Sequence, residues 1–156
     1  MALKGAAAWQ DAVRVDVMLY HIVPALEFRA RIEGAAYRPA TLAHDGFVHC
    51  ALGASVLSVA NDYYSRVSGQ LLLLEIDPER LACETRYEAP APIAGAGSSH
   101  LASASEFPHV YGPIEMEAIT RVGLLISTTS GFQWPTAFME LESFLSHAEA
   151  RRPTSR

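Results

Sequence analysis

The sequence lacks the covalent and metal-binding patterns that hold many small folds together. It contains 2 cysteines, Cys50 and Cys83, and neither has a second thiol close by in the chain. This spacing excludes a disulfide framework and a zinc knuckle, and it fits reduced thiols in a cytosol. A chain of 156 residues can bury roughly two thirds of its unfolded surface as one domain. The fold therefore needs neither disulfides nor a bound metal for its stability.

Long apolar segments and clustered positive charges are also missing. No run reaches the roughly 18 apolar residues of a membrane helix, and the aliphatic run 71–74 has the length of a strand. Segment 1–17 carries Asp11, Arg14 and Asp16 where a signal peptide needs its apolar core. The net charge is -5, with no Lys or Arg run to bind a nucleic-acid backbone or an anionic membrane. We therefore expect no membrane span, no secretion and a cytoplasmic location.

The order of apolar and turn residues predicts an α+β fold. The run 71–74 predicts a buried central strand, Thr41 to Asp45 a turn, and Ser55 a helix cap. These elements indicate split, mostly antiparallel β-sheets, two in number, with flanking helices at 24–33 and 55–64. We expect strands at 17–23, 47–50, 70–76, 85–88 and 118–127, the last being the final strand, and a terminal helix over 138–148.

We expect one folded domain with two less ordered ends. Residues 17–127 form its main part, 1–16 form an amino-terminal arm, and 128–156 add a terminal helix and a frayed tail. Segment 89–106 is rich in Ala, Pro, Gly and Ser, a composition typical of a mobile loop. It is either a tolerated surface insertion or a lid over a site, because it leads directly into the segment that starts at Phe107.

Three histidines lie on three of the predicted strands: His21, His49 and His109. Imidazole is easily tuned for proton transfer, metal ligation or phosphate binding near neutral pH, so we expect the fold to bring them to one hollow. Each could instead be a core histidine satisfied by backbone groups, since an unpaired nitrogen costs about 1 to 3 kcal/mol. Cys50 follows His49, but neighbouring strand residues point to opposite faces, which disfavours a Cys-His nucleophile.

A series of short motifs occurs in a recognisable order along the chain. They are His21-Ile22, Gly34 with Tyr37, Asp45 to Cys50, Leu72 to Leu74, and Phe107 to Ile114. In these motifs the chain resembles the small bacterial family DUF952, over about residues 19–122. The resemblance implies an ADP-ribosyltransferase-like fold, in which a split sheet surrounds a cleft for a nicotinamide dinucleotide.

The resemblance also implies roles for particular side chains. In such transferases a first-strand histidine holds the adenosine ribose, aromatic rings stack on nicotinamide, and a late glutamate grips the other ribose. By position His21 takes the first role and Tyr37 or Tyr111 the second. Each tyrosine could instead pack in a core, where its hydroxyl needs one partner. Glu115 or Glu117 takes the third, with Glu115 preferred because it follows the turn after Tyr111. That carboxylate would stabilise an oxocarbenium-like centre.

The sequence departs from the family pattern at three positions. Phe28 stands where tryptophan is usual, Ala51 where serine usually follows the histidine-cysteine pair, and Val56 where glutamine is common. Two polar side chains of the implied site are therefore missing. Their absence indicates a changed ligand, or a site that binds without turnover.

The leading hypothesis is a site for a small molecule of nucleotide or dinucleotide type, an NAD-like dinucleotide among them. Its reaction would be ADP-ribosyl transfer or glycosidic-bond hydrolysis. The alternatives are a non-catalytic binding or sensing module, and a metal-dependent enzyme that uses the three histidines as ligands. In the leading hypothesis the catalytic residues are His49 and Glu115, and the binding residues are His21, Tyr37, His109 and Tyr111.

Overall fold

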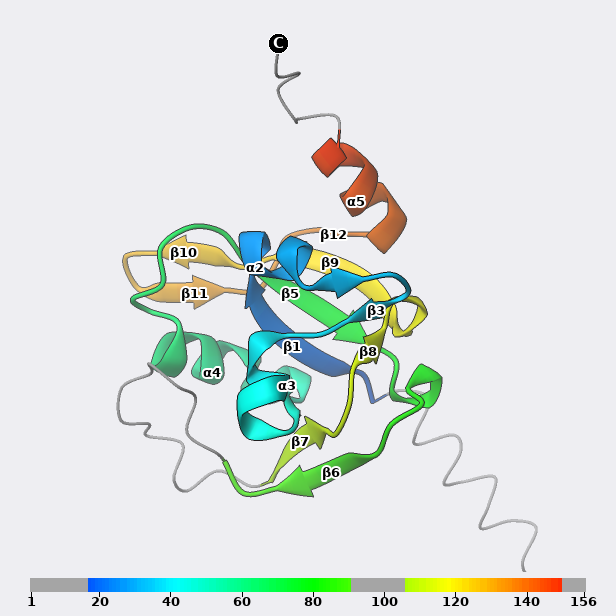
Figure 1. Cartoon of the computed structure of the whole chain (residues 1–156). Helices are drawn as coiled ribbons and strands as arrows, with labels where there is room; N and C mark the ends of the chain where they lie inside the picture. The colour runs from blue at the N-terminus through cyan, green and yellow to red at the C-terminus, as the bar shows by residue number, and fades with distance from the viewer. Residues whose placement is uncertain (1–16, 91–105, 150–156) are drawn as a thin grey trace, which may run out of the picture.

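The aliphatic run of the sequence forms the middle of the largest sheet. β5 (Leu71–Ile76) is buried along its whole length and lies between β1 (Leu19–Pro24) and β9 (Ile119–Leu124). β12 (Phe138–Met139) pairs with the far edge of β9, and all these pairs are antiparallel. Figure 1 shows this sheet crossing the middle of the molecule. The predicted central strand is confirmed.

Both faces of this sheet are covered. Successive side chains of a strand point to opposite faces, so Leu72 and Leu74 join one apolar cluster while Leu71 and Leu73 join another. A strand that is buried on both sides needs apolar residues at every position. The two clusters therefore explain the uninterrupted run of leucines.

The structure is a computed structural model that describes residues 17–90 and 106–149. The predicted arm 1–16, most of the predicted loop 89–106 and the predicted tail lie outside the described residues. Within the described ranges the fold is α+β with antiparallel strand pairs, as predicted. None of the helices in these ranges is long and apolar enough to cross a membrane.

The other strands form three smaller groups, where the sequence predicted two sheets in total. Two of the groups are three-stranded and the third is a hairpin (Figure 1). Their strands are two to four residues long. Turns end them early, as at Gly34, whose φ is 59°. The groups are β2 (Ile32–Glu33), β3 (Ala36–Tyr37) and β8 (Ile114–Glu115); β4 (Val48–His49), β7 (Phe107–Val110) and β6 (Thr85–Glu88); and β10 (Ile126–Thr128) with β11 (Gly131–Gln133).

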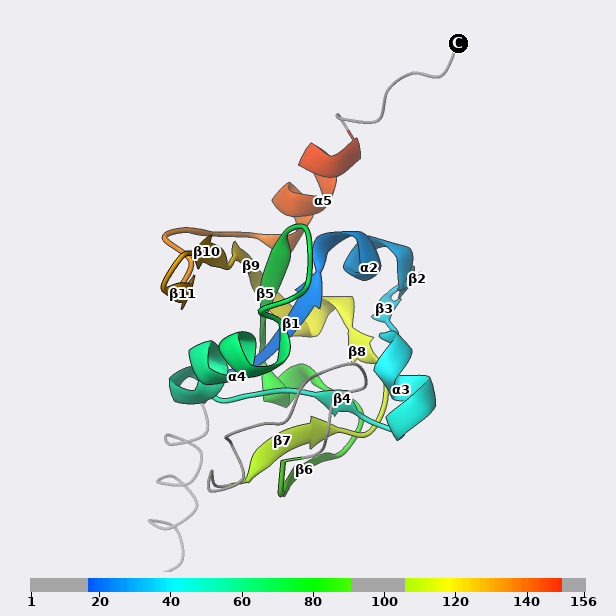
Figure 2. The ribbon, with the colours of Figure 1, turned by 90° about the vertical axis from the view of Figure 1, so that its left-hand side faces the viewer.

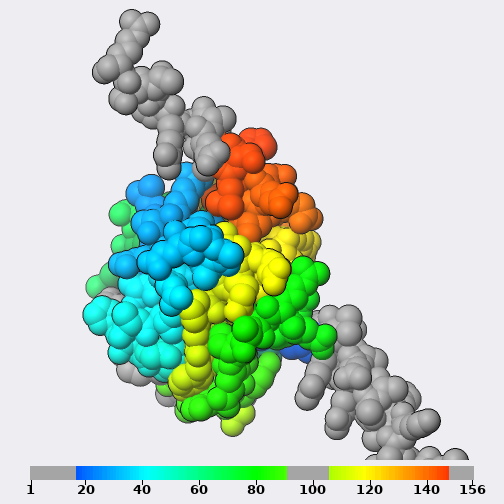
Figure 3. Space-filling view, turned by 45° about the vertical axis from the view of Figure 1, so that its right-hand side comes forward, coloured from blue at the N-terminus to red at the C-terminus, as the bar shows by residue number. Residues whose placement is uncertain are grey.

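In residues 17–90 and 106–149, four α-helices surround the sheets. Figure 2 shows α4 beside the sheet of β4, β7 and β6, which lies below β1 and β5. In Figure 3 the orange-red α5 lies against the blue segment that contains α2. This contact includes Phe28 and Phe144, whose ring centroids are 6.2 Å apart. The helices are α2 (Ala25–Ala30), α3 (Ala40–Asp45), α4 (Val56–Tyr63) and α5 (Leu141–Glu149).

Two predictions near the amino end were wrong in detail. The helix predicted over 24–33 ends at Ala30, because Ile32 and Glu33 pair with β3. The turn predicted over 41–45 is the helix α3, which Gly46 closes with a φ of 81°. A helix of six residues has too few apolar positions to show a helical period in sequence.

Later boundaries also differ from the prediction. The last strand was expected at 118–127, but β9 ends at Leu124 and three further strands follow. The terminal helix starts at Leu141, because Phe138 pairs in β12 opposite Gly123. A Cβ on Gly123 would lie 2.8 Å from the Phe138 ring, so the glycine makes room for this strand. Ser55 lies in a 3-10 turn and makes no side-chain cap.

A buried carboxylate ties the three central strands together. Tyr20 and Arg121 stand opposite Glu75 on the strands to either side. Glu75 accepts hydrogen bonds from the hydroxyls of Tyr20 and Thr120 and from two nitrogens of Arg121. The Arg121 hydrogen bonds, above all, lower the pKa of Glu75 despite its burial. Tyr20 is thereby held in one position.

Replacing Leu74 by alanine tests the importance of the central strand. Leu74 is 0% exposed, so Leu74→Ala should lower the free energy of unfolding by about 2 to 5 kcal/mol through lost burial and a cavity. Urea denaturation measures the change. Leu26→Ala removes the same atoms from a side chain that is 83% exposed and should cost less than about 0.5 kcal/mol. Equal losses in the two variants would contradict the two-sided core.

Candidate functional site

Two of the predicted histidines meet across a pair of neighbouring strands. β4 and β7 are antiparallel with His49 directly opposite His109, and directly opposed side chains share one face of a sheet. The two imidazole centroids are 5.6 Å apart, edge to face. The ring of Phe47 stacks on His109 at a centroid distance of 4.1 Å. Strand pairing thus assembles a two-histidine centre from distant parts of the chain.

A carboxylate at the end of α3 orients the first of these histidines. The left-handed Gly46 ends the helix, in a conformation that glycine adopts without strain, and the chain turns back toward β4. Nε2 of His49 donates to Oδ2 of Asp45 at 2.7 Å. The lone pair of the neutral ring then lies on Nδ1. His49 is therefore oriented as a proton acceptor.

The second histidine has a buried nitrogen without a hydrogen-bond partner. His109 is 2% exposed, and its Nδ1 makes no hydrogen bond to the described part of the chain. Oε1 of Glu88 lies 3.6 Å from it, and the Tyr111 hydroxyl donates to the same oxygen. Burial lowers the pKa of His109, with a further contribution from His49, while Glu88 acts in the opposite direction.

The third histidine lies behind this centre. Nδ1 of His21 is 2.7 Å from the main-chain oxygen of His49, and Nε2 is 2.9 Å from the Tyr37 hydroxyl. Because a carbonyl only accepts, Nδ1 carries the proton and Nε2 accepts from Tyr37. Burial lowers the pKa of His21 to about 4, so the ring stays neutral. His21 therefore holds the main chain of His49 in place.

Tyr37, predicted to stack on a ligand, is packed in the core. Its side chain is 0% exposed, and its ring meets Phe28 at a centroid distance of 5.0 Å. Burial raises the pKa of its hydroxyl far above the usual value. The hydroxyl is therefore a permanent donor to His21.

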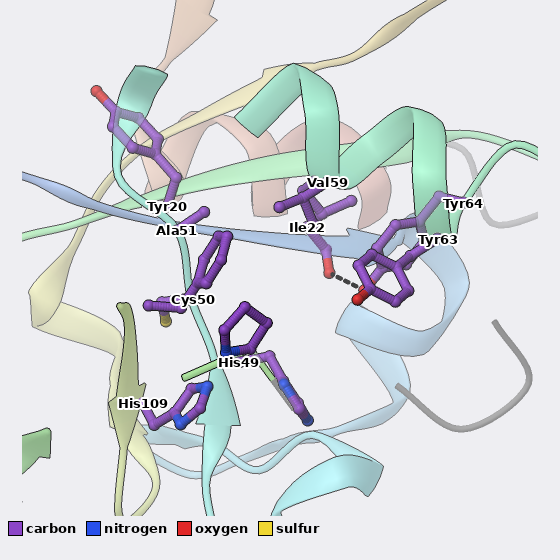
Figure 4. Close-up of a pocket in the computed structure, with 11 residues that line it drawn as sticks. Tyr20, Ile22, His49, Cys50, Ala51, Val59, Tyr63, Tyr64 and His109 are labelled. Carbon is purple, nitrogen blue, oxygen red and sulfur yellow. Dashed lines mark hydrogen bonds between the residues drawn. The ribbon is translucent and has the colours of Figure 1, made fainter. Parts of the chain in front are cut away.

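The two-histidine centre opens onto a hollow on the α4 side of the main sheet. Its empty volume is about 460 Å³, counted out to the open mouth and including the solvent space there. Figure 4 shows Tyr63 and Tyr64 at one end and Tyr20 at the other, with His49 and His109 below Ile22. None of the described residues that line it is Lys or Arg. The other main walls are Tyr20 and Ile22 of β1, Val59 and Tyr63 of α4, Tyr64 just after α4, and Phe107 of β7.

The remaining predicted site residues do not line this hollow. The ring of Tyr111 packs under the guanidinium of Arg86, at 4.4 Å. The carboxylate of Glu115 accepts from the main-chain nitrogen of Ala82 at 3.3 Å. Cys50 does line the hollow, but burial raises the pKa of its thiol to about 12. That thiol is not a nucleophile near neutral pH.

The three histidines do not form one ligand set for a metal. Both ring nitrogens of His21 are engaged inside the fold, whereas His49 and His109 face the hollow. The structure, over 17–90 and 106–149, places no group of three or more His, Cys, Asp or Glu side chains to hold a metal ion.

Sequence reasoning missed two acidic residues at this centre. Asp45 stands four residues before His49 and was interpreted as part of a turn, so its side chain received no role. Recognising Gly46 as the end of a helix would have placed Asp45 next to the histidine. Glu88 reaches His109 only through the register of β6 against β7, for which the sequence carries no local signal.

Comparisons with known proteins give a family and a fold. The family model described as "Protein of unknown function (DUF952)" matches residues 22–122. A crystal structure of protein CC0527 from Caulobacter crescentus is similar, with 25% identity and a TM-score of 0.58 over 83% of this chain and 98% of that one. The solution NMR structure of CC0527 is 23% identical, with a TM-score of 0.55 over 76% and 91% of the two chains. A comparison with curated proteins finds no match.

The buried state of His21 predicts how stability depends on pH. Its folded pKa of about 4 lies below the ordinary histidine pKa of 6.5, so the unfolded chain binds more protons between these values. The free energy of unfolding should therefore fall as the pH is lowered from 6.5 to 4, as chemical denaturation at several pH values measures. His109 contributes in the same direction.

The His21→Gln variant isolates this contribution. It should show a flatter dependence than the wild type, with the contribution of His109 remaining. An NMR titration of the wild-type ring gives a second measurement, in which His21 stays neutral down to about pH 4. An unchanged slope in the variant, or protonation of the wild-type ring near pH 6.5, would contradict the assignment.

Proposed function

The chain belongs to the DUF952 family, a family of unknown function, and from that premise we propose that it acts on a small molecule of nucleotide type. The ring of this molecule binds in the hollow, and His49 helps to cleave or transfer its glycosidic bond. The supporting observation is the Asp45–His49 pair, whose imidazole lines the hollow beside a second imidazole. An NAD-like dinucleotide, which the ADP-ribosyltransferase-like resemblance implies, is one ligand of this type.

The walls of the hollow favour a flat ring over a row of phosphates. Tyr20, Tyr63 and Phe107 offer aromatic surfaces that can stack on a planar base. The described lining residues include no Lys or Arg, the side chains that bind phosphate most often. The base and its sugar therefore occupy the hollow, and any phosphate lies outside it.

His49 supplies base catalysis in this proposal. Nδ1 takes a proton from water, or from an acceptor hydroxyl, while the oxygen attacks the anomeric carbon. Asp45 stabilises the imidazolium that forms, because its carboxylate already accepts a hydrogen bond from Nε2 of His49. A positioned acid or base of this kind contributes about 10²- to 10⁴-fold to a rate. Glu115 has no part in this step, because its carboxylate bonds Ala82 outside the hollow.

Binding without turnover is a second candidate function. Glycosidic-bond chemistry often uses a carboxylate to stabilise an oxocarbenium-like centre. Here Asp45 is bonded to His49, and Glu88 accepts from Tyr111. The two carboxylates next to the imidazoles are thus already engaged by other side chains, an arrangement that also suits a ligand sensor.

Thermal-shift screening followed by a turnover assay tests both candidates. A ligand that binds only the folded protein raises its melting temperature, so nucleosides, nucleotides and NAD are screened first. Incubation with labelled forms of the binders then detects cleavage. Turnover supports the enzyme, and a shift without turnover supports the sensor. No shift with any compound would contradict both.

Substituting His49 tests the catalytic proposal directly. His49→Ala should lower turnover by about 10²- to 10⁴-fold while far-UV circular dichroism shows a folded chain. His44→Ala is the matched control, since His44 is an exposed histidine on α3, and it should turn over like the wild type. Wild-type turnover in His49→Ala would remove this residue from the mechanism.

A further inference from the structure

We infer that Glu88 positions His109 as a general acid, and that the substrates are nucleosides whose base carries no charge. This inference rests on the proposed function, which it deepens by naming the substrate class. It assigns to the hollow two carboxylate-imidazole pairs, Asp45 with His49 and Glu88 with His109.

The register of the strands places Glu88 beside His109. Arg86 stands directly opposite His109 in the β6–β7 pair, so Glu88 is its diagonal neighbour on the same face. The Tyr111 hydroxyl donates to Oε1 of Glu88, which fixes the carboxylate 3.6 Å from Nδ1 of His109. A small movement would bring these two atoms within hydrogen-bond distance.

Glu88 favours the protonated form of His109, against burial and His49, which lower its pKa. In the neutral form Nδ1 is buried without a hydrogen-bond partner in the described ranges. When His109 is protonated, both ring nitrogens donate, and Glu88 is the acceptor placed for Nδ1. Nε2, which Glu88 does not contact, is then the nitrogen that can give its proton to a substrate. Catalytic hydrogen bonds are often long without substrate, as the 3.6 Å separation is here.

Two such pairs allow one proton to be taken and another to be given in the same step. Nδ1 of His49 takes a proton from water, and the water oxygen forms a bond to the anomeric carbon. The bond from that carbon to the base nitrogen breaks, and its electron pair takes the proton from Nε2 of His109. The products are the free sugar and the neutral base. Exchange with solvent returns each histidine to its starting form.

The need for an acid identifies the class of substrate. A pyridinium ring, as in nicotinamide nucleosides, leaves its sugar as a neutral molecule and requires no proton. An uncharged purine or pyrimidine would leave as an anion unless an acid protonates it. A general acid made of a second imidazole and its own carboxylate therefore speeds the reaction only of substrates whose base is uncharged. The described walls also lack Lys and Arg, which favours nucleosides over their phosphates.

The variant Glu88→Gln tests the pair, with Glu84→Gln as the control. Glu84 is exposed and bonded to Arg86, so its loss leaves the hollow intact. The groups that act on the charge of His109 are His49, Asp45 and Glu88. Because Glu88 favours the charged ring, Glu88→Gln should lower the pKa of His109 in an NMR titration, and Glu84→Gln should not. An unchanged pKa in Glu88→Gln would overturn the positioning role.

Turnover of two probes tests the substrate class. Inosine has an uncharged base and nicotinamide riboside a pyridinium ring. The wild type should cleave inosine, and Glu88→Gln should do so at least about 10-fold more slowly, with the alkaline limb of its pH profile moved to lower pH. Cleavage of nicotinamide riboside should be the same in both proteins.

The outcomes separate this inference from the proposed function. A wild type that cleaves nicotinamide riboside or NAD, but not inosine, overturns the inference and leaves the proposed function standing. A wild type that cleaves none of the three overturns both. Equal loss of both activities in Glu88→Gln, with a lower melting temperature, would show a structural role only and would also overturn the inference.

Discussion

The candidate site depends on the seam between the main sheet and the sheet of β4, β7 and β6. At this seam Tyr20 and Ala51 exchange two main-chain hydrogen bonds. Beside them Nδ1 of His21 donates to the main-chain oxygen of His49. Tyr37 completes the chain of donors from the core. The position of His49 is thus set by the packing of the core, and the hollow is the space that remains on the other side.

The site combines a rigid back with half-exposed polar partners at the front. His21 and Tyr37 are buried and fully hydrogen-bonded to each other and to the seam, so their protonation does not change near neutral pH. Asp45 and Glu88 are partly exposed and contact His49 and His109 from the outer side. This arrangement suits the proposed proton transfer, because buried groups hold the geometry while the carboxylates beside the imidazoles stay partly exposed to solvent.

The sequence predicted the meeting of His49 and His109 but not the orientation of His21. In both short strands the histidine stands between apolar residues, and alternation predicts that it points to the face opposite its two neighbours. β1 belongs to a sheet that is buried on both sides, so alternation cannot tell which face holds the hollow. The sequence left core packing and ligand stacking both open for Tyr37, and its ring packs against Phe28 in the core. Glu88 required the register of β6 against β7, which becomes visible only in three dimensions.

The aromatic wall and the imidazoles of the hollow come from different elements of the fold. The tyrosines on the helical side come from α4 and the residue after it, whereas the imidazoles come from β4 and β7. Of the helical tyrosines, Tyr64 alone bonds the main chain of β1, through the oxygen of Ile22. Substitutions at Val59 or Tyr63 therefore remodel the wall without disturbing the paired strands. Under the proposed function, ligand preference can therefore change through one helix while the two paired histidines keep their positions.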